Sequence, residues 1–150
     1  MTWQINSTSS ESTEQLGRDI GARLRGGEVI ELSSDLGGGK TTFVRGLAAG
    51  MGSNDAVTSP SFTISQVYQA GEVTLHHYDF YRLPDAGLMR QELAEVLDDP
   101  KAVVVVEWAA VVGDVLPAKR VTLTITTTGE NERQIAISLP PQLRYIRGDA

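Results

Sequence analysis

The chain has 150 residues, of which 41% are hydrophobic, and 13 Lys and Arg against 19 Asp and Glu give it a formal net charge of −6. This length suits a single domain over residues 1–150 with its own hydrophobic core. The absence of cysteine excludes disulfides, thiolate chemistry and cysteine-based metal sites, and the acidic balance argues against a protein that grips nucleic acid alone.

The N-terminal segment and the hydropathy of the chain predict a soluble, cytoplasmic protein with no membrane association. The first six residues have neither the basic flank nor the apolar core of a signal peptide. Apolar runs stay well short of the ~18–20 residues that a membrane-spanning helix needs.

The first part of the chain alternates between strand and helix patterns. Trp3 and Ile5 alternate with polar neighbours, which is a weak strand signal. Apolar residues spaced by four then predict a helix that stops at the double glycine Gly26-Gly27. The apolar residues of this helix are Leu16, Ile20 and Leu24. Two residue pairs have the spacing of a capping box at its start, namely Ser12 with Gln15 and Thr8 with Glu11.

The remaining patterns predict a mixed sheet with helices on both faces. The ranges with strand patterns are 28–32, 63–68, 73–78, 103–106, 121–125 and 135–139, and those with helix patterns are 41–51, 85–97 and 109–116. The valines at 103–106 are typical of a strand covered on both faces. The last two strands alternate strictly around a turn, which predicts a C-terminal antiparallel hairpin. A tail begins at Pro140-Pro141.

A glycine-rich turn, Ser34-Asp-Leu-Gly-Gly-Gly-Lys-Thr41, joins a predicted strand to a predicted helix. It matches the phosphate-loop pattern G-x-x-x-x-G-K-[S/T] except at Ser34, where a serine causes strain only if its φ is positive. Glycine N–H groups and the helix N-terminus can enclose the phosphates of a nucleotide, while Lys40 reaches the β- and γ-phosphates. The expected fold class is therefore α/β, a P-loop NTPase-like mixed β-sheet flanked by helices. The residues expected to bind the nucleotide here are Gly37, Gly38, Gly39, Lys40, Thr41 and Thr42.

Two acidic residues follow predicted strands and suit the metal site that such a loop requires. Glu107 ends the valine strand, and Asp79 ends the strand 73–78. Ligands of α/β proteins bind outside the carboxyl ends of the strands, so both acids can meet Lys40 and Thr41 at one edge. We expect Thr41 and Glu107 to hold Mg²⁺, and either acid to orient the attacking water. Asp79 also suits a cap at the entry to the next segment.

Four motifs in this order resemble the TsaE family, P-loop ATPases of bacterial tRNA threonylcarbamoyladenosine biosynthesis. The motifs are Asp35 to Leu47, Thr58 to Thr63, His77 to Leu83 and Val106 to Trp108. The resemblance covers nearly the whole chain, and it implies ATP and Mg²⁺ as cofactors with catalytic roles for Lys40, Asp79 and Glu107. It also implies that Ser9 lies near the adenine and that residues 58–63 form a nucleotide switch.

The same resemblance implies partners. Proteins of the family act with TsaD and TsaB to form threonylcarbamoyladenosine at position 37 of tRNA, so we expect this chain to contact tRNA only indirectly and to hydrolyse ATP slowly without its partners. The residues alone leave two alternatives open: a small-molecule kinase with the same phosphate loop, and a binding switch whose nucleotide changes partner affinity without appreciable hydrolysis. The chain lacks the N-K-x-D box of guanine readers, which favours ATP over GTP.

Overall fold

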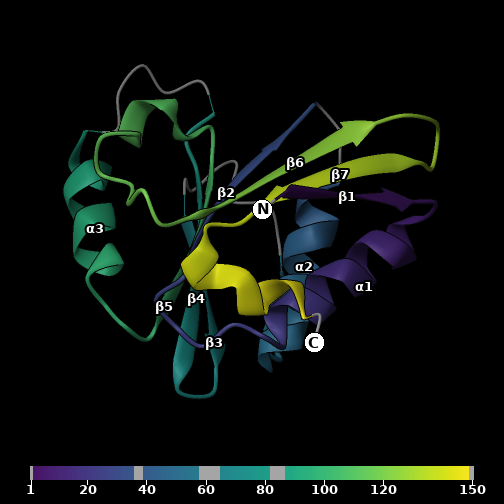
Figure 1. The fold of residues 1–150 in the computed structure, drawn as a ribbon. Helices are drawn as coiled ribbons and strands as arrows, with labels where there is room; N and C mark the ends of the chain where they lie inside the picture. The colour runs from purple at the N-terminus through teal and green to yellow at the C-terminus, as the bar shows by residue number, and fades with distance from the viewer. Residues whose placement is uncertain (1, 36–38, 58–64, 82–86, 149–150) are drawn as a thin grey trace.

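A seven-stranded mixed sheet runs through the molecule, with helices on both of its faces (Figure 1). The computed structural model describes residues 2–35, 39–57, 65–81 and 87–148. The strand order is β1-β7-β6-β2-β5-β4-β3, in which β6, β2, β5 and β4 run parallel to one another. The pairs β1–β7, β7–β6 and β4–β3 are antiparallel. This arrangement confirms the predicted α/β fold and its C-terminal hairpin.

The strands and helices have the following bounds. The strands are β1 Thr2–Ser7, β2 Val29–Ser34, β3 Ser65–Ala70, β4 Val73–Asp79, β5 Ala102–Glu107, β6 Val121–Thr127 and β7 Arg133–Ser138. The helices are α1 Ser10–Gly21, α2 Lys40–Met51, α3 Leu88–Leu97 and the 3-10 helices η1 Ala109–Val112 and η2 Pro141–Arg147. None of the helices that the structure describes is long and apolar enough to cross a membrane.

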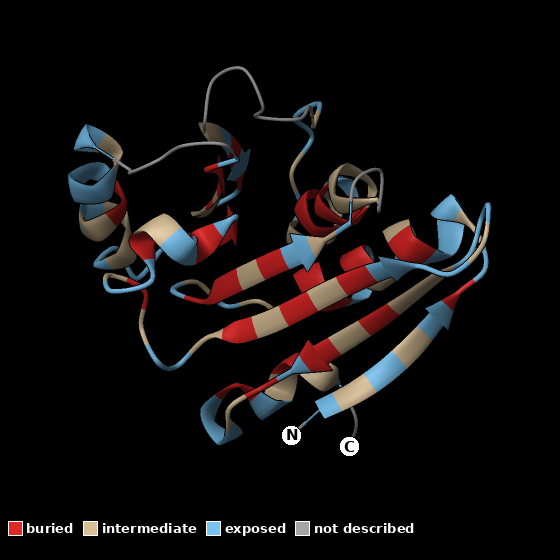
Figure 2. Cartoon of the chain, turned by 90° about the horizontal axis from the view of Figure 1, so that it is seen from above, coloured by how far each residue is buried: buried red, intermediate tan, exposed pale blue. Residues whose placement is uncertain are grey.

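The valine strand β5 shows why the sheet carries two helix layers. Val103 and Val105 join the hydrophobic cluster beneath α1, α2 and η2, whereas Val104 and Val106 join the cluster beneath α3 and η1. Every residue of β5 is buried, while β6 and β7 alternate between buried and less buried positions (Figure 2). The prediction of a strand covered on both faces is therefore confirmed.

Both capping boxes predicted for α1 are wrong. The N-cap is Ser9, whose Oγ accepts a hydrogen bond from the Ser12 N–H at 3.1 Å, while the Ser12 Oγ accepts one from the Ser9 N–H at 3.2 Å. A serine hydroxyl thus takes the part that Glu or Gln plays in the usual capping box. The buried Ser7 hydroxyl lies 2.6 Å from the Ser12 Oγ and holds that side chain in place.

Further boundaries differ from the prediction: the predicted helix 109–116 is the shorter η1, Ala109–Val112, and the end of α1 and the start of the tail also differ. Helix α1 ends at Gly21, before the double glycine, because the N–H groups of Arg23 and Leu24 bond to carbonyls three residues back and tighten the chain. The tail expected after Pro140 is the 3-10 helix η2. It is ordered because its Leu143 and Ile146 are buried in the larger hydrophobic cluster.

Helices α1 and α2 run parallel and touch backbone to backbone through glycines spaced by four. Gly17 and Gly21 on α1 face Gly46 and Gly50 on α2, and a Cβ built on any of the four would lie 2.0–2.4 Å from a carbonyl oxygen of the other helix. A larger side chain has no room in this glycine seam. The seam therefore fixes the N-terminus of α1 beside the N-terminus of α2.

His76 and His77 are neighbours on β4 and so point to opposite faces of the sheet. His76 belongs to the face toward α3, and its Nε2 lies 3.0 Å from the Thr74 Oγ1. Burial lowers the pKa of His76, and the carboxylates of Asp99 and Glu92 only partly oppose this shift. Because the folded-state pKa lies below the ordinary 6.5, the stabilising contribution of neutral His76 is present above that pH and is lost as the pH falls.

We expect Gly46→Ala to lower the free energy of unfolding by about 1–3 kcal/mol, the usual effect of overpacking, because the new methyl group must push α1 away. Chemical denaturation measures this change. Gly113→Ala is the matched control, since Gly113 has a φ of −55° and its Cβ would meet only ordinary contacts at 3.7 Å. Equal unfolding free energies for the two variants would contradict the proposed role of the seam.

We expect the thermal unfolding midpoint of the wild type to fall more steeply than that of His76→Gln between about pH 7 and about pH 5.5. The glutamine keeps a polar partner for Thr74 but takes up no proton, so the variant loses only the pH dependence that His76 contributes. Melting curves recorded across this pH range test the point. Parallel pH profiles for the two proteins would show that His76 does not couple folding to protonation.

Candidate functional site

Strands β2, β4 and β5 end together beside the start of helix α2. In the sheet register, Asp79 of β4 lies opposite Glu107 of β5, and Glu107 lies opposite Leu32 of β2. Lys40 is the first residue of α2. The carboxyl edge of the parallel strands therefore brings together Lys40, Asp79 and Glu107, three residues that the sequence singled out.

The carboxylate of Glu107 is held between two nitrogen atoms. Lys40 Nζ lies 3.0 Å from Oε1, and His77 Nε2 hydrogen-bonds to Oε2. Glu107 is 3% exposed and His77 is fully buried, so this charge is stable in the interior only because it is paired and hydrogen-bonded. His77 was not among the predicted site residues. The period of two along β4, which puts residues 77 and 79 on one face, is the signal that points to it.

The two acids at this edge differ in their tendency to hold a proton. Burial alone would raise the pKa of Glu107, but the hydrogen bonds and charges of His77 and Lys40 outweigh it, so the pKa lies below its usual value. Burial raises the pKa of Asp79, and the Glu107 charge adds to this, although the Tyr81 N–H and Lys40 oppose it. Glu107 is therefore the firmer anion, and Asp79 accepts a proton more readily.

Asp79 also caps the chain that follows it. Its Oδ1 accepts a hydrogen bond from the Tyr81 N–H at 3.0 Å, which is the local role left open by the sequence. Among the residues that the structure describes, Oδ2 of the same carboxylate has no hydrogen-bond partner. One oxygen is thus engaged by the backbone and the other remains available beside Glu107.

Both ends of the phosphate loop are anchored. Asp35 accepts hydrogen bonds from the Thr127 N–H at 3.0 Å and the Thr127 hydroxyl at 2.9 Å, at the end of β6. Gly39, the N-cap of α2, has a φ of 94°, a left-handed conformation that glycine adopts without strain. Within the described part of the chain, Trp108 alone among non-glycine residues has a positive φ. Ser34 therefore causes no backbone strain at the first position of the phosphate-loop pattern.

The start of α2 offers backbone donors to an anion. No side chain caps this helix by a hydrogen bond, and its first turn contains Lys40, Thr41 and Thr42 but no acidic residue. Unpaired N–H groups and the helix dipole favour a negative ligand at such a position. Two predicted phosphate ligands, Gly37 and Gly38, and the predicted switch at residues 58–63 lie outside the residues that the structure describes.

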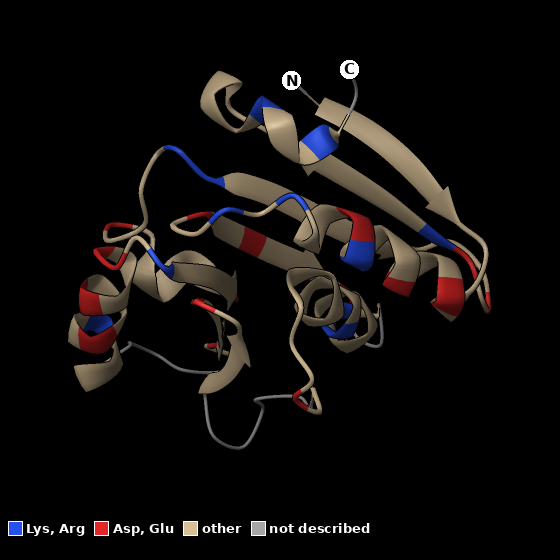
Figure 3. Ribbon diagram, turned by 90° about the horizontal axis from the view of Figure 1, so that it is seen from below, with Lys and Arg blue, Asp and Glu red and all other residues tan. Residues whose placement is uncertain are grey.

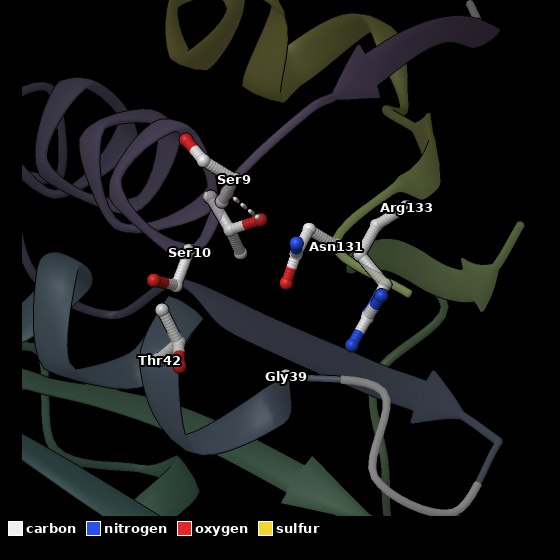
Figure 4. A pocket seen from close by; sticks show the side chains of 7 residues that line it. Ser9, Ser10, Gly39, Thr42, Asn131 and Arg133 are labelled. Carbon is white, nitrogen blue, oxygen red and sulfur yellow. Dashed lines mark hydrogen bonds between the residues drawn. The ribbon is translucent and has the colours of Figure 1, made fainter. Parts of the chain in front are cut away.

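A cavity of about 170 Å³ opens beside this helix start (Figure 4). Its lining residues are Ser9, Ser10, Thr13, Gly39, Thr42, Asn131 and Arg133. The predicted Ser9, Gly39 and Thr42 thus share one cavity although they come from the N-termini of two helices. Asn131 and Arg133 were not predicted, because the sequence shows the turn of the C-terminal hairpin but not that this turn faces the phosphate loop. In Figure 4 the Arg133 side chain extends from the hairpin toward Gly39.

The donors at this edge fit a magnesium ion that keeps part of its water shell. Among the described residues, no three His, Asp or Glu side chains are grouped so as to hold a metal by themselves. Mg²⁺ is usually bound through one or two carboxylates together with substrate phosphates, so such a group is not required. Glu107 already holds a cation, the Lys40 ammonium, and the Thr41 hydroxyl follows Lys40 on the same helix turn.

An exposed aromatic pair borders the buried carboxylate. Trp108 has a φ of 57°, so the chain turns sharply after Glu107 and leaves the indole 46% exposed. The centroid of the indole lies 4.9 Å from that of Tyr81 and 5.7 Å from Lys40 Nζ. Bulky residues seldom adopt this backbone conformation, and such strained residues cluster at functional sites.

Known proteins are similar to this chain in sequence and in fold. The family model described as threonylcarbamoyl adenosine biosynthesis protein TsaE matches residues 7–135. The tRNA threonylcarbamoyladenosine biosynthesis protein TsaE of Bacillus subtilis is 37% identical over 131 residues, covering 85% of this chain and 80% of that protein. The protein of the same name from Treponema pallidum is 36% identical over 132 residues, covering 88% and 97%. The crystal structure of Bacillus subtilis YdiB matches with a TM-score of 0.76 at 30% identity, covering 99% of this chain and 93% of that one.

Proposed function

The chain belongs to the TsaE family, and from this premise we propose that it is a Mg²⁺-dependent ATPase that assists the formation of threonylcarbamoyladenosine at position 37 of tRNA. Its relatives carry names that assign them to this biosynthesis. Support for the nucleotide and the metal comes from the chain's own residues at the carboxyl edge of the sheet.

The observation that carries the proposal is the pairing of Lys40 with Glu107. An ammonium group at the start of a helix opposes the helix dipole, so Lys40 is an unfavourable choice there unless an anion is to be bound. In the structure, the anion is the buried carboxylate at 3.0 Å. A phosphate group entering the loop would take the place of this carboxylate, and a cation beside Glu107 would take the place of the ammonium.

The ribose and adenine of a nucleotide would extend from the phosphates into the neighbouring cavity. Thr42 lies at the phosphate end and also lines the cavity that reaches Ser9 on one side and Asn131 and Arg133 on the other. We assign the ribose and adenine to this cavity, whose walls offer hydroxyl, amide and guanidinium groups to polar atoms of the ligand. The N-cap of α1 and the C-terminal hairpin would then both contact the base.

The chemistry follows from the two acids. Mg²⁺, held by Thr41 and Glu107, would supply positive charge to the β- and γ-phosphate oxygens. Lys40 and the N–H groups at the start of α2 would stabilise the charge that develops on the γ-phosphoryl group. We assign the water to Asp79, because its Oδ2 has no hydrogen-bond partner among the described residues, whereas Oε2 of Glu107 is bonded to His77 and Oε1 would face the Mg²⁺. The water oxygen forms a bond to the γ-phosphorus while the bond between that phosphorus and the β–γ bridging oxygen breaks, so that ADP leaves with the bridging oxygen. The proton of the water passes to Asp79.

We further propose that TsaD and TsaB are the partners in the cytoplasm and that they, rather than this chain, hold the tRNA. The formal charge of −6 disfavours tight binding of a polyanion. The described Lys and Arg residues are spread over several elements of the ribbon in Figure 3. As the family resemblance implies, we expect slow hydrolysis by the isolated chain.

We expect Lys40→Met to weaken ADP·Mg²⁺ binding about 10- to 100-fold, because it removes a charged donor to the phosphates but keeps the aliphatic stem. Calorimetric titration measures the affinity, and ATP hydrolysis with and without TsaD and TsaB measures the activity. Lys101→Met is the matched control, since Lys101 is an exposed lysine on the turn before β5. Undiminished binding by a folded Lys40→Met protein would refute the phosphate-loop assignment.

We expect Asp79→Asn to lower the rate of hydrolysis by about 10²- to 10⁴-fold while nucleotide affinity stays within about threefold of the wild type. The asparagine oxygen can still accept the hydrogen bond from Tyr81, so the fold is retained. Single-turnover hydrolysis and calorimetry separate the two quantities. If hydrolysis persists at the wild-type rate, the water belongs to another residue; if the variant still supports tRNA modification fully, the nucleotide acts as a binding switch.

A further inference from the structure

His77 meets the candidate site through Glu107. It is fully buried on β4 and is not among the residues lining the cavities beside Lys40 and Thr42. On its own face of the sheet, Leu75 lies two residues earlier on β4 and Asp79 two residues later, while Val105 of β5 and Gln66 of β3 are its partners in register. His77 therefore contacts the candidate site through Glu107 and does not line these cavities itself.

The hydrogen bonding of the imidazole shows what it contributes. Nε2 carries a hydrogen, because the carboxylate oxygen that it contacts can only accept one. Nδ1 is buried with no hydrogen-bond partner among the described residues. An unpartnered polar atom in the interior is unfavourable, so an apolar side chain of similar size would suit the surrounding core better. Among the described residues, the one hydrogen bond of the His77 side chain is that with Glu107.

The two contacts of Glu107 differ in whether they persist when nucleotide binds. Lys40 has a long flexible stem, and under the proposed function its ammonium leaves Oε1 for the phosphates. His77 is enclosed by the core and cannot follow. Once Lys40 has moved, the orientation of the carboxylate depends on the hydrogen bond between His77 and Oε2.

We propose that His77 is a positioning residue, which fixes Oε2 of Glu107 and so keeps Oε1 directed at the cation that accompanies the nucleotide. The inference rests on the proposed function, because it needs Glu107 to face a metal ion. Residues that orient metal-binding carboxylates and imidazoles by a hydrogen bond typically change metal affinity 10- to 100-fold when they are replaced. Replacing His77 should therefore lower the affinity for the metal ion.

The test measures these two affinities separately in the full chain. ADP binding in the presence of EDTA is followed by calorimetry, and Mn²⁺ binding to the ADP complex is followed by electron paramagnetic resonance. We expect His77→Leu to bind Mn²⁺ in the ADP complex about 10- to 100-fold more weakly than the wild type, and this loss comes in addition to any loss of ADP affinity measured in EDTA. His77→Gln, whose amide N–H can replace Nε2–H, restores most of the Mn²⁺ affinity. His76→Leu, on the other face of the same strand, is the matched control and behaves like the wild type.

The outcomes separate this inference from the proposed function. Wild-type Mn²⁺ affinity in His77→Leu, or a His77→Gln protein as weak as His77→Leu, overturns the role of His77 while the nucleotide site stands. A wild-type protein that binds no ADP overturns both. If His77→Leu does not fold, nitrogen-15 NMR of the wild type decides: we expect the hydrogen on Nε2 both before and after Mg²⁺·ADP is added, and an Nε2 without hydrogen in the loaded protein overturns the proposal.

Discussion

The buried carboxylate of Glu107 is the constraint on which the rest of the site depends. An ionised group removed from water is destabilising by several kcal/mol unless charge and hydrogen bonds compensate for it. Each of its oxygens has a separate partner, Lys40 from α2 and His77 from β4. Both partners reach it because β4 and β5 run parallel in a register that aligns Asp79 with Glu107, and because α2 begins where β2 ends. The charge of Glu107 thus links strands β4 and β5 to the start of α2.

The cavity beside the phosphate loop depends on a second constraint, the close contact of α1 with α2. The glycine seam lets the two helix backbones touch, and this brings Ser9 next to Thr42 although 33 positions separate them in the sequence. The hairpin closes the third side through Asn131 and Arg133, and the bonds from Thr127 to Asp35 attach the end of β6 to the loop. Three segments far apart in the chain therefore line one cavity.

The strands, the glycine-rich turn between β2 and α2 and the acids at the strand ends could be predicted because their signals are local: period two, glycine next to Lys-Thr, and a carboxylate after four valines. The N-cap at Ser9 could not, since it depends on a contact between β1 and the first turn of α1. The helix η2 depends on burial against the core, which no tail sequence reveals. Asn131 and Arg133 were missed because the direction of the hairpin is a property of the whole sheet. The role of His77 needed the register of two strands that lie far apart in the chain.

The exchange at Lys40 has a consequence for how ligands bind. In the structure each charge of the pair neutralises the other, so under the proposed function phosphate must draw the ammonium away from a carboxylate that then stays buried with His77 alone. A cation arriving without phosphate meets the opposite difficulty, because the ammonium already occupies its place beside Oε1. When nucleotide and metal bind together, the phosphate pairs with Lys40 and the metal ion pairs with Glu107, so neither charge is left without a partner. In the proposed function, the Lys40–Glu107 pair therefore makes the binding of ATP and of Mg²⁺ favour each other, and by linkage the same coupling makes their release favour each other.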